Sequence, residues 1–293
     1  MRGEKEGRAL NHVRRFLFCD KLQQPIVFWD KSVYDISDKE FMSDYACYCN
    51  FGLKSFYGLT ADDMPVVLNA LRTAQENPDA SEFPDFIFSN GLIEHFQITA
   101  SKQTKKKGSE EKISDQKFKK SMNEELQEYY NYCNENPSFD QIRSKSWTRD
   151  NMPDYSYTYL CQSFKNNLEK HLKSLNKYNG CKDMTIFLIE NDEVNIEMCE
   201  TLGQINGEMR CDYPVRQEHF IRYMLSRDKD MLEYLYTFRE FIDYVIYYYE
   251  EGFEIIKIES MPELLKYIPH KYIMEPRKIK MTHRVVNITR KLQ

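Results

Sequence analysis

The chain has 293 residues, 41% of them hydrophobic and 14% aromatic, which is enough for one large core or two modest ones. The 30% of charged residues and a mean hydropathy of −0.69 predict a soluble protein. No apolar run approaches the roughly 18 residues that a membrane span needs. The net charge of −5 argues against a protein that is basic throughout.

The N-terminal stretch MRGEKEGRALNHVRR is charged and has no apolar segment ahead of a small-residue cleavage site. We therefore expect no secretory signal and a cytoplasmic location. The eight cysteines include no C-x-x-C pair, and Cys47 and Cys49 lack a second pair or histidines at zinc-ligand spacing. Reduced thiols are the expectation, in agreement with a cytosolic protein.

The N-terminal part of the chain has helical patterns. Residues 38–58 carry apolar residues at helical spacing and end at Gly58, and residues 60–77 begin with a potential capping Thr60. Two apolar segments then flank Asn90-Gly91, which is a strong signal for a tight β-hairpin turn.

Helical and strand patterns alternate in the rest of the chain. The stripe of leucines, Phe164 and Tyr178 within 160–178 is typical of a helix that packs on a core. We expect helices at 115–136, 160–178 and 261–268, a buried strand at 183–190, and a second hairpin at 239–260 that turns at Glu251-Gly252. This order of elements predicts a mixed α/β or α+β fold.

The first hairpin, residues 83–99, places two acids among apolar residues. If Asn90-Gly91 is a two-residue turn, Asp85 and Glu94 lie on one face as diagonal neighbours, about 7–8 Å apart. The residues expected on that face are Asp85, Ile87, Glu94, Phe96 and Ile98. Two converging carboxylates can share a Mg²⁺ ion, which stabilises charge on a phosphoryl group; without a cation they repel and one pKa rises.

Other interpretations of this hairpin remain open. Asp85 can cap a turn beside Pro84 while Glu94 pairs with a lysine. His95 falls on the same face as Phe86, where we favour a hydrogen-bonded core histidine over a proton carrier.

Two basic segments stand out on the acidic chain. Residues 102–120 hold eight lysines and three acids, and residues 271–293 hold seven Lys and Arg and one acid. These segments are compatible with phosphate contacts, but also with a solvated loop and with a solvated tail or edge strand. The candidate nucleic-acid-binding residues are Lys102, Lys105, Lys106, Lys107, Arg277, Lys278 and Lys280.

The segment PDFIFSNGLIEHF resembles the core motif of the PD-(D/E)xK nuclease superfamily, which has Pro-Asp at the start of one strand and (Asp/Glu)-x-Lys on the next. Pro84-Asp85 matches the first element, and Glu94 matches the acid of the second. The helix 160–178 and the strand 183–190 are similar to the helix and strand that complete that core. The resemblance covers about residues 60–190.

The resemblance implies a restriction-endonuclease-like core sheet, in which Asp85 and Glu94 bind Mg²⁺ or Mn²⁺. It divides the chain into an N-terminal helical region 1–59, a nuclease-like core 60–195, and a C-terminal α+β extension 196–293 packed on the core as one unit.

This chain departs from the superfamily pattern at the motif lysine, which is replaced by Phe96. The lysine orients or activates the attacking water, and a phenylalanine cannot. Gln97 can substitute if a bulge turns it inward, and Gln162 or Lys165 can reach in from the following helix. The remaining alternative is that catalysis has been lost.

The resemblance thus predicts a metal-dependent endonuclease that cleaves DNA, of a bacterial restriction or defence type. Symmetric cutting of a duplex would favour a homodimer. Its candidate catalytic residues are Asp85, Glu94, Gln97 and Lys165. The alternatives are a catalytically inactive nuclease-fold module that binds nucleic acid or a protein, and an interaction protein whose acids are salt-bridged. P-loop, G-x-G-x-x-G, G-x-S-x-G and H-E-x-x-H motifs do not occur, which argues against NTPase, dehydrogenase, esterase and zinc-protease chemistry.

Overall fold

A computed structural model describes most of the chain. The described residues are 4–18, 26–27, 54–79, 82–104, 108–136, 141–149, 152–191, 196–201, 218–249, 252–268, 272–277 and 281–289. The helices are α1 (Glu4–Phe18), α3 (Asp63–Thr73), α4 (Glu110–Glu135), α5 (Tyr157–Lys177), α6 (Lys229–Tyr236) and α7 (Met261–Tyr267), with a 3₁₀ turn at Leu225–Arg227. Among these helices, none is both long and apolar enough to cross a membrane.

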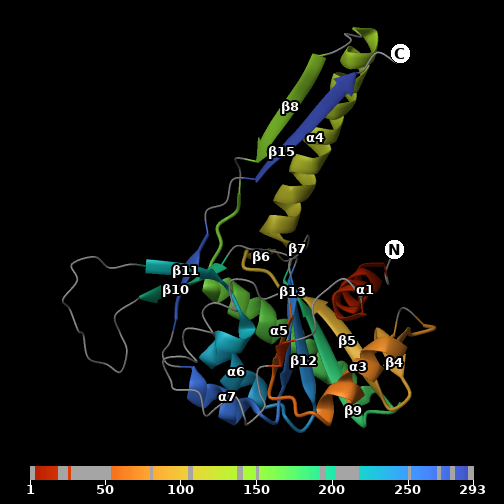
Figure 1. The fold of residues 1–293 in the computed structure, drawn as a ribbon, viewed down its shortest axis with the longest axis vertical. Coiled ribbons are helices and arrows are strands. Elements are labelled where there is room, and N and C mark those ends of the chain that lie inside the picture. The colour runs from red at the N-terminus through yellow and green to blue at the C-terminus, as the bar shows by residue number, and fades with distance from the viewer. Residues whose placement is uncertain are drawn as a thin grey trace, which may run out of the picture.

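One large mixed sheet organises the body of the protein (Figure 1). Its strands, in spatial order, are β1 (Ile26–Val27), β2 (Lys54–Tyr57), β13 (Gly252–Lys257), β12 (Tyr244–Tyr249), β9 (Met184–Glu190), β5 (Gly91–Gln97), β4 (Phe86–Phe88) and β3 (Gln75–Glu76). β9 is parallel to both β5 and β12, whereas both hairpins are antiparallel. The expected mixed α/β fold is therefore confirmed, and strands from all three expected segments share one sheet.

The other described strands form three small sheets. They are formed by β10 (Ile196–Thr201) with β11 (Glu218–Arg222) and β14 (Ile273–Pro276), by β8 (Gln141–Arg149) with β15 (Met281–Thr289), and by β6 (Gln103–Thr104) with β7 (Gly108–Ser109).

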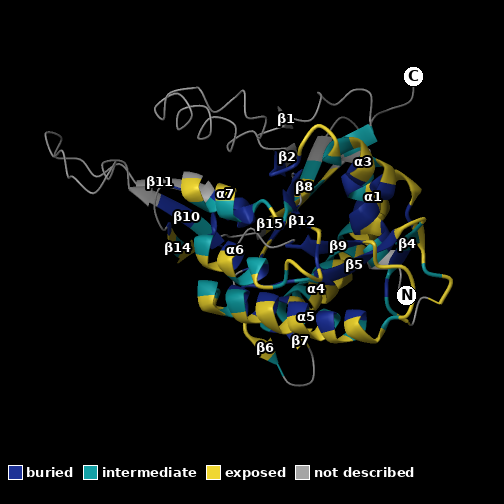
Figure 2. Cartoon of the chain, turned by 90° about the horizontal axis from the view of Figure 1, so that it is seen from below, coloured by how far each residue is buried: buried dark blue, intermediate teal, exposed yellow. Residues whose placement is uncertain are grey.

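Helices cover both faces of the large sheet. Residues of α5, α6 and α7 pack on one face, and residues of α1 and α3 pack on the other. All seven residues of β9 are buried, which explains why its sequence is almost continuously apolar: a central parallel strand is covered on both sides. Figure 2 shows the contrast between these buried strands and the exposed outer side of α5.

Helix α5 confirms the stripe predicted for residues 160–178. Ser156 caps its N-terminus, because the side-chain oxygen accepts the backbone N–H of Thr158. The stripe residues Leu160, Phe164, Leu168, Leu172 and Leu175 are all buried. Each fully buried side chain of this kind contributes about 1.5–3 kcal/mol relative to an exposed one, so the stripe fixes α5 firmly on the sheet.

The first hairpin forms as predicted, but its turn is shifted. Phe86 pairs with Ile93 and Phe88 with Gly91, so Ser89 and Asn90 make the turn instead of Asn90 and Gly91. Gly91 is needed for another reason, since a Cβ atom there would lie 2.0 Å from the carbonyl oxygen of Met184 in β9.

Because the shift changes the register by two residues, the alternation of faces is kept. Leu92 and Phe96 pack in the same core as α5, and Ile93 packs in the core on the opposite face. The face prediction for β5 is therefore confirmed although the turn is wrong.

Three local predictions differ from the structure. Residues 54–57 form β2 rather than the end of a helix, and residues 38–53 lie outside the described part. The helix that starts near Thr60 ends at Thr73, and the next residues pair with β4 as strand β3. Strand pairing overrides the local helical pattern in both places, with the distant β13 for β2 and with the nearby β4 for β3. The helix expected at 115–136 begins earlier, at Glu110, so α4 includes the end of the lysine-rich segment 102–120.

An arm extends from the body (Figure 1). It consists of α4 and the two-stranded sheet β8–β15, which is paired along nine residues of each strand. The sequence did not indicate β8 or the pairing of the two strands, because the partners are more than a hundred residues apart; an edge strand in the C-terminal segment was one of the open alternatives. The basic C-terminal segment is thus a strand over residues 281–289, paired with β8.

Candidate active site at the Asp85–Glu94 hairpin

The two acids of the first hairpin lie opposite each other on neighbouring strands. Asp85 directly precedes β4 and Glu94 lies in β5, one position beyond the Phe86–Ile93 pair. The backbone N–H of Asp85 donates to Glu94 Oε2 at 3.0 Å, and the N–H of His95 donates to Asp85 Oδ2 at 2.8 Å. The acids are therefore directly opposed rather than diagonal.

Burial and charge repulsion act together on Asp85. Burial is the larger cause and the charge of Glu94 the second, and they raise the pKa of Asp85 to about 6. The hydrogen bond from the His95 amide acts in the opposite direction and lowers this pKa. A nearby cation would stabilise the ionised form of Asp85, because its charge would offset both the cost of burial and the repulsion from Glu94.

A histidine from α5 completes the cluster. His171 Nδ1 lies 2.5 Å from Glu94 Oε1, and its side chain is 17% exposed. The ring stacks on Phe96 with centroids 5.2 Å apart and an angle of 17° between the planes. The residue at the motif-lysine position thus supports a histidine that contacts the acid two positions earlier.

Sequence reasoning missed His171, although the sequence carries a signal for it. Ser163, Asn167 and His171 are four residues apart and form a polar stripe beside the buried one. Asn167 Nδ2 donates to the carbonyl of Gln97 at 3.0 Å, and Ser163 Oγ accepts the N–H of Thr99 at 3.2 Å. The stripe therefore binds β5 and the residues that follow it, from Glu94 to Thr99.

The expected substitutes for the motif lysine make other contacts. β5 pairs with β9 without interruption from Gly91 to Gln97, so the bulge that would turn Gln97 inward is absent from these paired residues. Gln97 Nε2 instead donates to Glu190 Oε2 at 2.7 Å. Lys165 Nζ lies over the ring of Tyr234 in α6, 4.7 Å from its centroid, and Gln162 is exposed on α5. None of these contacts involves Asp85 or Glu94.

His95 is a buried, hydrogen-bonded histidine, in agreement with the favoured interpretation. Its Nε2 lies 2.8 Å from Glu190 Oε2, which Gln97 also contacts. His95 packs on the opposite face of β5 from Glu94, so the two neighbouring residues belong to separate polar clusters.

The predicted phosphate-binding residues are only partly described. Lys102 is exposed, and Arg277 Nε lies 3.0 Å from Glu197 Oε1. Lys105, Lys106, Lys107, Lys278 and Lys280 lie outside the described residues.

The donor set at the hairpin suits a hard divalent cation. Mg²⁺ is commonly held by one or two carboxylates together with waters and substrate phosphates, and Asp85 and Glu94 provide the two carboxylates. Within the described part of the chain, no group of three or more His, Cys, Asp or Glu side chains is placed to hold a metal ion by itself.

Comparisons with known proteins do not extend this description: no protein family, no curated protein and no solved structure matches the chain.

Proposed function

We propose that this protein is a metal-dependent phosphodiester hydrolase that cleaves DNA, with Asp85 and Glu94 as ligands of Mg²⁺ or Mn²⁺. The observation that carries the proposal is the direct opposition of the two acids on adjacent strands, with the pKa of Asp85 raised to about 6. Two buried like charges lower the stability of the fold unless a counter-charge is bound. A bound cation would offset this cost and so account for the presence of both acids.

The arrangement of neighbouring elements supports a restriction-endonuclease-like core. β4 and β5 carry the two acids, and α5 and β9 follow in the chain. α5 packs on the face of β5 that carries Glu94, and β9 pairs with β5 in parallel. These are the helix and the strand that the resemblance requires, and both lie next to the acidic hairpin.

His171 takes over the task of the motif lysine in this proposal. A bound cation would supply Lewis-acid chemistry at the phosphoryl group. Nδ1 of His171 contacts Glu94, which leaves Nε2 to accept a proton from the attacking water. The stacking on Phe96 fixes the plane of the imidazole, so the substitution of lysine by phenylalanine and the placement of His171 belong together.

Cleavage and metal binding of four purified proteins test the proposal. Wild type, Asp85→Asn, Glu94→Gln and His171→Ala are incubated with supercoiled plasmid and Mg²⁺ or Mn²⁺, and Mn²⁺ binding is measured by calorimetry. We expect Asp85→Asn and Glu94→Gln to lose at least a hundredfold in cleavage rate and to bind Mn²⁺ at least tenfold more weakly. His171→Ala should lose at least tenfold in rate while it still binds Mn²⁺.

The exposed acid Glu240 offers a matched control, and Glu240→Gln should cleave and bind Mn²⁺ like wild type. Undiminished cleavage by Asp85→Asn would contradict the proposal, and so would a wild-type protein that neither cleaves DNA nor binds Mn²⁺.

A second candidate is a catalytically inactive nuclease-fold module that binds nucleic acid or a protein. Phe96 favours it, because this buried ring occupies the position of the motif lysine. The cleavage assay decides between the two candidates, because the inactive module cleaves DNA with neither Mg²⁺ nor Mn²⁺.

A further inference from the structure

We propose that the outer face of the β8–β15 ribbon is a docking surface for duplex DNA, separate from the acidic hairpin. The choice of DNA as the partner rests on the proposed function, whereas the location of the surface rests on the fold and charge of the arm.

Only one face of the ribbon is covered by α4. Trp147 in β8 donates from Nε1 to Glu125 of α4 at 3.0 Å, and Arg143 lies over the ring of Tyr132. His283 in β15 contacts the ring of Phe118, with centroids 5.6 Å apart. These residues share one face, because Trp147 is paired with His283 and Arg143 lies four residues before Trp147 on the same strand.

The opposite face of the ribbon is exposed and polar. Its described residues are Ser144, Ser146, Thr148, Thr282, Arg284 and Val286, all exposed. Hydroxyl groups and one guanidinium dominate it, and they are held in place by hydrogen bonds between the strands. Arg284 Nη2 lies 3.1 Å from Ser144 Oγ, and the hydroxyls of Thr148 and Thr282 lie 3.2 Å apart.

The charge of the ribbon is opposite to that of the whole chain. Its two strands, residues 141–149 and 281–289, contain the basic residues Arg143, Lys145, Arg149 and Arg284 and no Asp or Glu, in a chain with 41 basic and 46 acidic residues. On the covered face, Lys145 pairs with Glu125, and Arg149 pairs with Glu111. On the outer face, the described hydrogen bond of Arg284 goes to a neutral hydroxyl. A polyanion is the partner that this distribution complements.

The shape of the arm suits a duplex. Nine strand residues extend about 30 Å, and the ribbon projects away from the body in Figure 1. A two-stranded ribbon is one of the elements that the major groove of DNA admits, and Arg, Ser and Thr side chains are common donors to phosphate oxygens.

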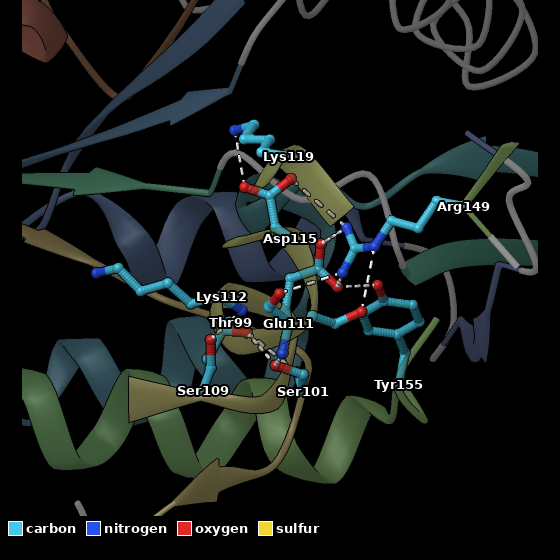
Figure 3. A network of polar contacts seen from close by, with 10 residues as sticks. Thr99, Ser101, Ser109, Glu111, Lys112, Asp115, Lys119, Arg149 and Tyr155 are labelled. Carbon is cyan, nitrogen blue, oxygen red and sulfur yellow. Dashed lines mark hydrogen bonds and ion pairs between the residues drawn. The ribbon is translucent and has the colours of Figure 1, made fainter. Parts of the chain in front are cut away.

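A buried polar network fixes the base of the arm to the body (Figure 3). Arg149 Nη1 lies 2.7 Å from Glu111 Oε1, and the Tyr155 hydroxyl donates to the same carboxylate. The N–H of Glu111 donates to Ser101 Oγ at 3.1 Å, and Ser101 follows β5 in the chain. The ribbon is therefore held at a set position relative to the acidic hairpin.

The outer face favours nucleic acid over a protein partner or a second copy of the chain. The central part of a stable protein–protein interface is rich in aromatic and large apolar side chains. The outer face has one such described residue, Val286, beside four hydroxyls and an arginine. Self-association through this face is an outcome that the test below would detect.

The test measures binding of the full chain to a fluorescein-labelled 25-base-pair duplex by anisotropy, in EDTA and at several NaCl concentrations. We expect Arg284→Glu to weaken binding at least tenfold. The negative slope of log affinity against log salt should become shallower by about 1 or more. Arg284→Lys should remain within threefold of wild type. Arg239→Glu, which reverses an exposed arginine of the body, should remain within twofold.

Three results would overturn the ribbon proposal: wild type that does not bind the duplex, Arg284→Glu that binds as tightly as wild type, or self-association of wild type that Arg284→Glu abolishes in sedimentation. Because EDTA removes the metal, the outcome is separate from that of the cleavage assay. Binding without cleavage in Mn²⁺ contradicts only the proposed hydrolase, and metal-dependent cleavage by an Arg284→Glu protein with unchanged affinity contradicts only the ribbon proposal.

Discussion

The body and the arm of this protein are held together by different interactions. In the body, β9 is buried along its whole length between two layers of helices. In the arm, the described buried apolar residues are Cys133 and Trp147, and polar side chains make the main contacts at its base. Apolar burial therefore stabilises the body, whereas ion pairs and hydrogen bonds determine where the arm points.

This difference predicts where a substitution acts. Loss of apolar volume in the body lowers the free energy of unfolding of the whole chain. Loss of a polar contact at the base of the arm opens the arm locally, because local opening needs less free energy than global unfolding.

The largest effect should come from Phe187→Ala in β9. Phe187 is fully buried and contacts the ring of Phe96, with centroids 6.0 Å apart. We expect a loss of about 3–5 kcal/mol in the free energy of unfolding, measured by urea denaturation. Val286→Ala, an exposed apolar truncation in the arm, should cost less than about 0.5 kcal/mol. Similar losses in the two variants would contradict the contrast between body and arm.

Arg149→Met should have the second largest effect and confine it to the arm. The substitution leaves the buried carboxylate of Glu111 without its guanidinium partner, which costs about 3 kcal/mol. Hydrogen exchange should show lost protection in β8 and β15 and unchanged protection in β9. The double variant Arg149→Met with Glu111→Gln should recover part of the loss, since the unpaired charge is then removed. Equal loss of protection in arm and body would argue for one cooperative unit.

Between pH 4 and pH 7.5, the free energy of unfolding of Asp85→Asn relative to that of wild type should rise by about 2 kcal/mol. The folded pKa of Asp85 is about 6, above its unfolded value of 3.8, so the folded state binds more protons between these values. Wild type is therefore stabilised at low pH and loses this stability as the pH rises through 6. Asp85→Asn lacks this contribution, so its stability relative to wild type should be higher at pH 7.5 than at pH 4.

Denaturation of both proteins at several pH values measures this difference. Mn²⁺ at pH 7.5 should then raise the free energy of unfolding of wild type more than that of Asp85→Asn. Parallel pH profiles of the two proteins would show that Asp85 is not the group that titrates.

Ser101→Ala tests the junction of body and arm and should have the smallest effect. Ser101 Oγ accepts the N–H of Glu111 and lies 2.9 Å from the Thr99 hydroxyl. The alanine leaves the buried amide without its acceptor, at a cost of about 1 kcal/mol. Hydrogen exchange at the first turn of α4 should accelerate. Unchanged exchange there would show that the Ser101 contact does not help to anchor the arm.

Local patterns predicted much of the body from the sequence. Each of these patterns lies within about twenty residues, so it can be recognised without knowledge of a distant partner. This holds for the stripe of α5, the apolar run of β9 and the two hairpins. The faces of β5 were also predictable, because they depend only on alternation along the strand. Both turns were placed one residue too late. Gly91 pairs with Phe88 and is needed for the close approach of Met184, and Gly252, expected in the second turn, is the first residue of β13 and pairs with Tyr249.

Elements whose partners are distant in the sequence could not be predicted in this way. β2 pairs with β13, and β8 pairs with β15, and neither partner is indicated by the local sequence. His171 was overlooked for a related reason: polar residues beside a core stripe are typical of a solvated helix face. Its contact with Glu94 depends on the packing of α5 along β5, which the local sequence does not indicate.

The polar stripe of α5 has a geometric consequence for the proposed cleavage of DNA. His171, Asn167 and Ser163 bind successive points from Glu94 to Thr99, and Ser101 then contacts the first turn of the arm. These bonds fix the distance between the hairpin and the ribbon. A duplex held on the ribbon would present a fixed stretch of backbone to the acids, and the fragments would end at a constant offset from the docked segment. Inserting one residue into the segment 98–100 would change that offset.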